Sequence, residues 1–181
     1  MELETRRLVL RPLRDDDVPA MARALNNYEV SKNLSRVPFP YTLDDARFFI
    51  DLQRGFDLRS KFCAIAFRAA PDELIGVISY EHKADSDGFE FGYWLDESFW
   101  GMRIMTEAAR AMVAHAFLSD GIAVLKAGFW NPVSGHLLRN LGFVETHRNS
   151  IFSVAQNREM PAVKLELTFE MWAAQQKGRA A

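Results

Sequence analysis

The stretch WGMRIMTEAARAMVAHAF, from Trp100 to Phe117, joins a short loop to a strongly patterned segment. From Met105 onward its apolar residues recur at intervals of three and four, which is the spacing that brings them to one side of an α-helix. The stripe predicts a helix packed against the core, because such stripes far more often build a core than a ligand site. His115 is expected among the solvated residues of this helix. The stripe comprises Met105, Ala108, Ala109, Met112, Val113, Ala116 and Phe117.

The loop before this helix is a candidate anion-binding site. The N–H groups of a helix's first turn have no partner within the helix, and the helix dipole adds positive potential there. A strand that ends in WLD, a loop that contains Gly101 and a following helix together form an arrangement suited to phosphate groups. A single glycine specifies little, so an ordinary surface loop remains the alternative at this point.

Residue patterns in the rest of the chain predict alternating strands and helices. Their order is one strand, two helices, three antiparallel strands, a helix, a strand, a helix and two strands, which indicates a mixed α/β sandwich with one main sheet. Asp15–Asp17 and the pair of Thr42 and Asp45 mark the starts of the first two helices, and Gly55 is expected to end the second. The predicted strands cover 7–13, 61–68, 74–83, 89–96, 122–130, 143–147 and 163–172, with turns at 71–73 and 85–88 and helices at 15–27, 43–55, 105–117 and 131–142.

Length and composition place the chain among ordinary globular proteins. Its 181 residues favour one domain over 1–181, and it is 49% apolar and 25% charged. A net charge of −2 argues against a broad nucleic-acid surface, and no apolar run approaches the roughly 20 residues of a membrane span. Cys63 is the only cysteine and the four histidines show no ligand spacing, so no metal is expected. The start MELETRRLVL lacks the basic region of a signal peptide, and we expect a cytoplasmic protein.

A second pattern, FWNPVSGHLLRNLGFVE, begins where the strand predicted at 122–130 ends. Asn131 is suited to cap a helix, Pro132 to occupy its first position and Gly142 to end it. These three residues therefore have structural explanations. Ser134 falls at the third helical position, where a hydroxyl brings no special gain, so it is either a solvated serine or a functional one.

The segments GYWLDESFWGMRIMTEAARAMVAHAF and NPVSGHLLRNLGF together resemble the GNAT superfamily of acyl-CoA N-acyltransferases. The resemblance is closest to its RimJ/RimL-type branch, the ribosomal-protein N-terminal acetyltransferases and their relatives. It covers nearly the whole chain through TRRLVLRPLRDDD, FPYTLDDARFFI, ELIGVISY and EMW. It implies a GNAT-like α/β (α+β) fold, with a mixed, mostly antiparallel central sheet, helices on both faces, and two central strands, at 89–95 and 122–130, that splay apart.

The resemblance also implies a site for acetyl-CoA as cosubstrate. The pantetheine arm would lie between the splayed strands and pair with the backbone of Trp94 and Leu95. Asn131 would contact this arm or the nearby backbone, and Ser134 would lie near the thioester sulfur. The pyrophosphate would rest on the loop and first helical turn formed by Trp100, Gly101, Met102, Arg103, Ile104, Met105 and Thr106.

The loop departs from the family pattern WGKGIMTEA at two positions. Met102 replaces the usual basic residue, and Arg103 occupies the place of the second glycine. Glycine there permits close approach of the backbone to a phosphate group. Arg103 must therefore point outward or adopt a conformation that still exposes the amide, and its guanidinium could supply the charge that Met102 lacks.

Acetyl transfer needs a base for the amine and an acid for the leaving thiolate. Ser134 is the candidate acid, and Glu90 is the candidate base, acting through water. Strand alternation predicts equally well that Glu90 is a surface glutamate. The loop at 34–41 is the expected wall of the acceptor site, where Arg36, Phe39 and Tyr41 would either select the acceptor or only pack the loop.

We expect the acceptor to be a peptide or protein α-amine. An α-amine with a pKa of roughly 7.7–8.0 is about a tenth neutral at pH 7, whereas a lysine amine near 10.4 needs roughly 3 kcal/mol more to become neutral. A small-molecule amine, such as a polyamine or a drug, remains an alternative, as does a non-catalytic acyl-CoA-binding module. The sequence does not identify the oligomeric state.

Overall fold

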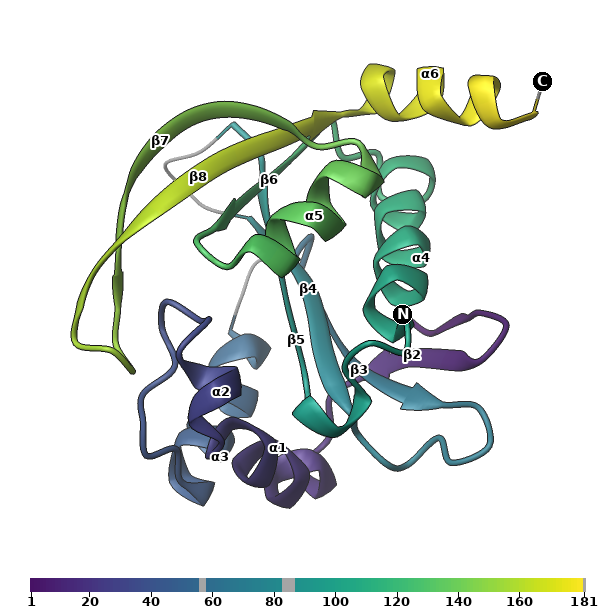
Figure 1. The fold of residues 1–181 in the computed structure, drawn as a ribbon. Helices are drawn as coiled ribbons and strands as arrows, with labels where there is room; N and C mark the ends of the chain where they lie inside the picture. The colour runs from purple at the N-terminus through teal and green to yellow at the C-terminus, as the bar shows by residue number, and fades with distance from the viewer. Residues whose placement is uncertain (56–57, 83–86, 181) are drawn as a thin grey trace.

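The computed structural model describes residues 1–55, 58–82 and 87–180, and it places eight strands in one sheet (Figure 1). The strand order is β1-β2-β3-β4-β5-β6-β8-β7, and each neighbouring pair is antiparallel except β5 and β6, which are parallel. This arrangement confirms the mixed, mostly antiparallel sheet. The strands are β1 Leu3–Glu4, β2 Leu8–Pro12, β3 Lys61–Phe67, β4 Gly76–His82, β5 Phe89–Leu95, β6 Val124–Phe129, β7 Val144–Ser153 and β8 Arg158–Thr168.

Helices cover both faces of this sheet, as the resemblance implied. On one face, Val77 of β4 packs in a cluster with Met21 of α1 and Ile50 of α3. On the other face, Ile78 packs in a second cluster with Met112 of α4. The helical segments are η1 Asp15–Asp17, α1 Val18–Leu25, α2 Tyr28–Ser31, α3 Leu43–Arg54, η2 Glu97–Phe99, α4 Ile104–Leu118, α5 Pro132–Leu141 and α6 Phe169–Ala180.

The two central strands splay apart. Strands β5 and β6 pair only through Phe89 with Leu125 and Glu90 with Lys126, at the start of each strand. Beyond these two pairs β5 has β4 as its only sheet neighbour among the described residues. One edge of β5 is therefore left unpaired along the segment that leads to α4.

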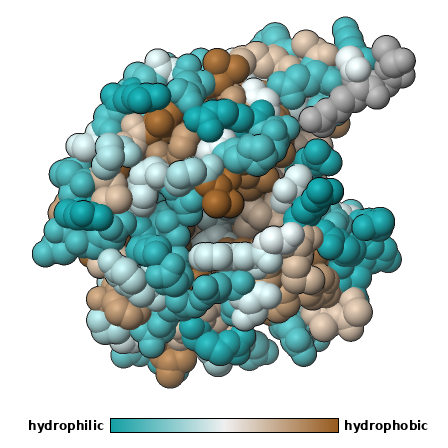
Figure 2. Space-filling view, in the orientation of Figure 1, coloured by the Kyte–Doolittle hydropathy of each residue, from teal (hydrophilic) through white to brown (hydrophobic). Residues whose placement is uncertain are grey.

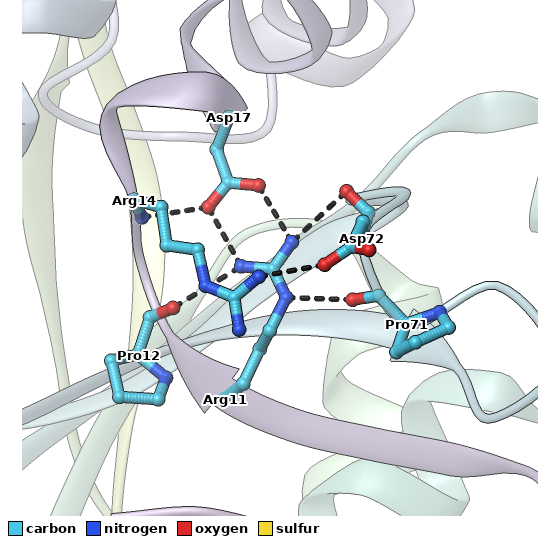
Figure 3. A network of polar contacts seen from close by, with 6 residues as sticks. All are labelled: Arg11, Pro12, Arg14, Asp17, Pro71 and Asp72. Atoms are coloured by element: carbon cyan, nitrogen blue, oxygen red, sulfur yellow. Dashed lines mark hydrogen bonds and ion pairs between the residues drawn. The ribbon is translucent and has the colours of Figure 1, made fainter.

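A buried ion pair fixes the beginning of α1 to the sheet (Figure 3). The guanidinium of Arg11 on β2 donates to both carboxylate oxygens of Asp17, at 2.7 and 2.9 Å, and to the carbonyl of Pro71 at 2.7 Å. The hydrogen bond to Asp17 raises the pKa of Arg11. Both side chains are 2% exposed. Because each buried charge has partners, the network holds η1 and the turn before β4 together without an uncompensated charge.

The patterned stretch forms α4 as predicted, with two corrections. The helix begins at Ile104, which is buried, whereas Met105 is only partly buried. His115 was expected to be solvated, and this was wrong. It is mostly buried, with Nε2 3.4 Å from Oδ1 of Asp120, because the chain after α4 turns back beside it.

The C-terminal third differs most from the prediction. The strand predicted at 143–147 continues to Ser153 in β7, whose residues are mostly exposed and so carry no alternating pattern. Its partner β8 begins at Arg158, earlier than predicted, and ends at Thr168. Phe169 was expected on the face of this last strand, but it begins α6 and packs against Phe117 and Trp172.

Other boundaries shifted by smaller amounts. Strand β1, helix α2 and helix α6 were not predicted, and Asp15–Asp17 form a short 3-10 helix rather than the first turn of α1. Gly55 follows the last residue of α3, as predicted, but with right-handed helical dihedral angles. The predicted strand end at 83 and the first half of the predicted turn at 85–88 lie outside the described residues.

Candidate active site

A cavity of about 570 Å³ lies beside the splayed strands. Its walls come from α3, the loop at 34–41, strands β4, β5 and β6, the start of α5 and the end of the β7–β8 hairpin. Figure 2 shows the molecular surface from this side, with hydrophobic and hydrophilic side chains mixed around a hollow. The segments that the sequence assigned to the acceptor and to the thioester therefore border one space.

Along the unpaired edge of β5, every second residue directs its backbone N–H and C=O groups toward β6. The N–H of Asp96 donates to the carbonyl of Ile75 at 2.9 Å. Alternation in an antiparallel ladder then turns the peptide groups of Leu95 and Tyr93 away from β4 and those of Trp94 toward it. Leu95 thus presents its backbone to the splayed region, whereas Trp94 contributes its side chain to the cavity wall.

The Leu95 carbonyl on this edge already has a partner. The indole Nε1 of Trp100 donates to it at 2.9 Å. The Leu95 N–H is therefore the group left to meet an added strand-like ligand at this residue, and Trp100 acts first as a brace between β5 and the loop before α4.

The loop before α4 adopts left-handed backbone at two positions. Gly101 has φ 76°, and Arg103 has φ 57° and ψ 21°. Arg103 thus has a left-handed conformation of the kind that glycine adopts readily, at a cost of roughly 1–2 kcal/mol for a residue with a Cβ.

The first turn of α4 lacks a side-chain cap. Arg103 at its N-cap makes no capping hydrogen bond, whereas Thr42 caps α3 and Asn131 caps α5. The N–H groups at the start of α4, from Ile104 to Thr106, are therefore suited to receive an anion. In this loop Met102 is half exposed and contributes no charge.

An N-terminal clamp, formed by Thr5 and Arg7 with Glu107, holds this loop. The Glu107 carboxylate accepts hydrogen bonds from the Thr5 hydroxyl at 2.6 Å, the Arg7 N–H at 2.8 Å and Arg7 Nε at 2.7 Å. Arg7 Nη1 also donates to the carbonyl of Met102 at 3.1 Å. Burial raises the pKa of Glu107, but the hydrogen bonds from Thr5 and Arg7 outweigh it, so the net pKa is lowered.

Sequence reasoning assigned none of these clamp residues to the site. The available signal was that TRRLVL and TEAAR occur in segments of the same resemblance, although they lie about 100 residues apart.

The start of α5 brings Asn131 and Ser134 to the cavity. The Asn131 side-chain oxygen accepts from the Val133 N–H at 2.9 Å, which confirms its capping role and leaves its NH₂ group for other contacts. Ser134 lines the cavity, and its carbonyl accepts from the Tyr93 hydroxyl at 3.4 Å. Burial raises the pKa of Tyr93 to about 12, so its phenol stays protonated at neutral pH. Tyr93 is a second hydroxyl at this place that the sequence did not reveal.

Two glutamates face the cavity from neighbouring strands. Glu90 on β5 pairs directly with Glu81 on β4, and both line the cavity with Arg36. Glu90 is half-buried there, so it is not simply a surface residue. Glu81 is buried, and its Oε2 lies 2.8 Å from Nη2 of Arg36. Its hydrogen bond to Glu81 raises the pKa of Arg36.

The acceptor loop only partly matches its prediction. Arg36 and the buried Tyr41 line the cavity. Phe39 is not among the described lining residues, because its ring packs edge-on against Tyr28 at a centroid distance of 5.2 Å. Its predicted contact with the acceptor therefore has no geometric support.

The β7–β8 hairpin closes a side of the cavity that the sequence left open. The Val154 N–H donates to the carbonyl of Ser35 at 3.0 Å, and Gln156 Nε2 donates to the carbonyl of Lys32 at 2.8 Å. The hairpin curves across the molecule to reach this loop (Figure 1). The prediction missed this contact because it ended β7 six residues early.

Two other kinds of site do not occur among the described residues. They contain no cluster of three or more His, Cys, Asp or Glu side chains that could hold a metal ion. None of their helices is long and apolar enough to cross a membrane.

Comparison with known proteins gives a consistent result. A family model described as an acetyltransferase (GNAT) domain matches residues 7–144. Ribosomal-protein-serine acetyltransferase of Escherichia coli (strain K12) is 38% identical over 76 residues, which are 40% of this chain and 42% of that protein. The match thus spans less than half of that curated relative.

Solved structures share the fold. RimL, a ribosomal L7/L12 alpha-N-protein acetyltransferase in complex with coenzyme A, superposes with a TM-score of 0.77 at 21% identity, covering 94% of this chain and 99% of that one. Spermidine N-acetyltransferase from Vibrio cholerae, in complex with CoA and spermine, gives a TM-score of 0.78 at 16% identity, covering 93% and 99%. At these identities the likeness concerns the fold alone.

Proposed function

The chain belongs to the acetyltransferase (GNAT) domain family, and from that premise we propose that it transfers an acetyl group from acetyl-CoA to the free α-amine of a peptide or protein. The observation that carries the proposal is that the start of α4, the open edge of β5 and the cavity adjoin one another. The uncapped start of α4 continues into the open edge of β5, and that edge borders the cavity that holds Ser134 and Glu90. A single-domain organisation over 1–181 and a cytoplasmic location are part of the same proposal.

The residues present fit acetyl-CoA. The pyrophosphate would rest on the N–H groups from Ile104 to Thr106, because the Arg103 side chain makes no capping hydrogen bond to them. The pantetheine arm would meet the Leu95 N–H on the β5 edge, with the Asn131 NH₂ group near it. These contacts would bring the thioester beside Ser134 at the cavity.

The chemistry follows from these positions. The neutral amine attacks the thioester carbon, the new C–N bond forms, and the C–S bond breaks. The amine proton leaves through water to Glu90, which passes it to solvent. The Ser134 hydroxyl donates a proton to the departing thiolate and regains one from solvent, so both side chains return to their starting state. Alignment of the two reactants can lower the barrier by up to roughly 7–11 kcal/mol. The opening between the splayed strands β5 and β6, which aligns them, is therefore expected to contribute most to catalysis.

An α-amine suits this site because the site offers only a modest base. No histidine is found among the described residues that line the cavity. A group with a pKa of roughly 8 needs little help to become neutral at pH 7, whereas lysine needs about 3 kcal/mol more. The Escherichia coli relative is named for acetylation of a ribosomal protein, which supports a protein acceptor.

A small cationic amine is the second candidate. The observation that favours it is the pair of carboxylates, Glu81 and Glu90, on the cavity wall. The two candidates share the requirement for a primary amine.

A competition experiment separates these acceptors. Equal concentrations of a lysine-free peptide with a free N-terminus, an N-blocked peptide with one lysine, and a polyamine are incubated with acetyl-CoA and read by mass spectrometry. We expect the free N-terminus to be acetylated first. Preference for the lysine peptide would contradict the proposal, and preference for the polyamine would establish the second candidate.

A further inference from the structure

The ion pair between Glu81 and Arg36 joins two side chains of very different exposure. The side chain of Glu81 is 5% exposed and that of Arg36 is 64% exposed, although their charged atoms lie 2.8 Å apart. Glu81 is fixed on β4, whereas Arg36 belongs to the loop between α2 and α3. A buried carboxylate needs a cationic partner, but an exposed guanidinium is stable in water without one. Arg36 is therefore the partner that can be exchanged.

The Glu81–Arg36 pair lines the cavity, where the Arg36 guanidinium is a cation held by a carboxylate. Glu81 and Glu90 stand directly opposite each other across β4 and β5, an arrangement in which like charges repel. The charges of both carboxylates act on the Arg36 guanidinium, which lines the cavity with them. The Arg36 guanidinium contacts Glu81, whereas Lys126 is the register neighbour of Glu90 on β6.

The rest of the nearby wall suits an apolar group. The same cavity is lined by Leu34 and Val37 of the Arg36 loop, by Phe49 of α3 and by Phe62 of β3. A ligand that matches these surroundings carries a cationic head on an apolar body. A protonated primary amine has that character, whereas a free carboxylate would be repelled by the two glutamates.

We propose that Glu81 receives the acceptor amine in its ammonium form and that Arg36 occupies the same carboxylate until the acceptor arrives. The bound ammonium then loses one proton to water, and the neutral amine attacks the thioester. The exchange leaves Glu81 with a cation throughout, and it releases Arg36 into water, where most of its surface already lies. Arg36 is thus a competitor of the acceptor rather than its ligand. The inference deepens the proposed function and rests on it only for the identity of the amine as acceptor.

The test is a binding measurement without acetyl transfer. A lysine-free peptide with a free N-terminus, and separately n-butylammonium, are titrated calorimetrically into protein saturated with CoA instead of acetyl-CoA. Arg36→Gln should tighten binding of the amine by about tenfold, and Glu81→Gln should weaken it by at least about tenfold, as expected for a charge-assisted contact. Arg47→Gln, which removes a similar but exposed pair with Asp44 on α3, is the matched control and should bind like the parent.

The direction in which each substitution changes the affinity for the amine decides the outcome. Weaker binding in Arg36→Gln, unchanged binding in Glu81→Gln, or no binding of either amine to the parent would each overturn the proposal. If Arg36→Gln fails to fold, Arg36→Lys keeps a cation at Glu81, and its affinity should lie between the parent and tenfold tighter; weaker binding would again overturn it. Because no acetyl group is present, failure of acetylation leaves this result intact, and binding of n-butylammonium alone would support Glu81 while contradicting the peptide acceptor.

Discussion

Replacing Glu107 with glutamine is the sharpest test of how the proposed cradle for the pyrophosphate is held. The substitution keeps the shape of the side chain but removes its charge, and it places an NH₂ donor where Arg7 Nε now donates. One charge-assisted hydrogen bond is lost, which is worth roughly 1.5–3 kcal/mol in a buried setting. Because Arg7 is 32% exposed, we expect the loss in free energy of unfolding to be about 1–2 kcal/mol.

This loss should appear in two measurements. For a chain of this size it corresponds to a fall in melting temperature of roughly 2–8 °C by calorimetry. The loop should also hold its left-handed conformation at Arg103 less well, since Arg7 ties the Met102 carbonyl to the same carboxylate. We therefore expect acetyl-CoA to bind about tenfold more weakly, which corresponds to about 1.4 kcal/mol.

The pH dependence gives an independent check. The pKa of Glu107 is lowered in the folded state, so its stabilising effect is present above its ordinary value of 4.5 and is lost as the pH falls through the folded pKa. The difference in melting temperature between the parent and Glu107→Gln should be full at pH 7 and should shrink below pH 4.5. Glu145→Gln is the control, because Glu145 has an exposed arginine partner and should change neither quantity. Equal acetyl-CoA affinity in Glu107→Gln and the parent would contradict the inference that the clamp supports acetyl-CoA binding.

Substitutions of Arg103, of Ser134 and of the Arg11–Asp17 pair test other parts of the account. Arg103→Gly should raise the free energy of unfolding by up to about 1 kcal/mol, because it relieves the left-handed strain. Arg103→Ala should keep the strain and bind acetyl-CoA about fivefold or more weakly. Parent-like affinity for acetyl-CoA in both variants would mean that the guanidinium does not contact phosphate. Ser134→Ala should lower kcat while leaving KM for acetyl-CoA nearly unchanged, and a rise in KM alone would make Ser134 a binding residue. Arg11→Met should lower the free energy of unfolding by roughly 3–5 kcal/mol in chemical denaturation, because it leaves Asp17 buried without its cation, and the double variant with Asp17→Leu should recover most of that loss; a loss below about 1 kcal/mol would contradict the buried pair.

The fold was predictable where local patterns carry their own signal. The stripe of α4, the Thr42 cap of α3 and the Asn131 cap of α5 each follow from a few neighbouring residues, and all three are confirmed. Splaying of β5 and β6 has no local pattern of this kind. It was expected only through the family resemblance.

The missed features depend on contacts between distant segments. Strand β7 is exposed for most of its length, so it lacks the alternation that marks a strand. The contact between the β7–β8 hairpin and Ser35 exists only in the folded chain. The pairing of Glu81 with Arg36 spans 45 residues, and the clamp on Glu107 spans about 100. Such polar pairs leave no periodic trace in the sequence.

Arg103 shows the limit of reasoning from a motif. The sequence indicated a glycine position filled by arginine and left two conformations open. The structure has Arg103 left-handed, which the braces from Arg7 and Trp100 on either side of the loop help to maintain. Only the surrounding fold decides between such alternatives.

The most direct test of the central claim is release of free thiol from acetyl-CoA, measured with and without a lysine-free peptide that has a free N-terminus. We predict that thiol appears only when the peptide is added, in step with the acetylated peptide detected by mass spectrometry, and that an N-blocked copy of the peptide gives none. Thiol release that is the same without any amine would show hydrolysis instead of transfer. The absence of release with any primary amine, together with measurable binding of acetyl-CoA, would contradict the enzymatic function and leave a binding module.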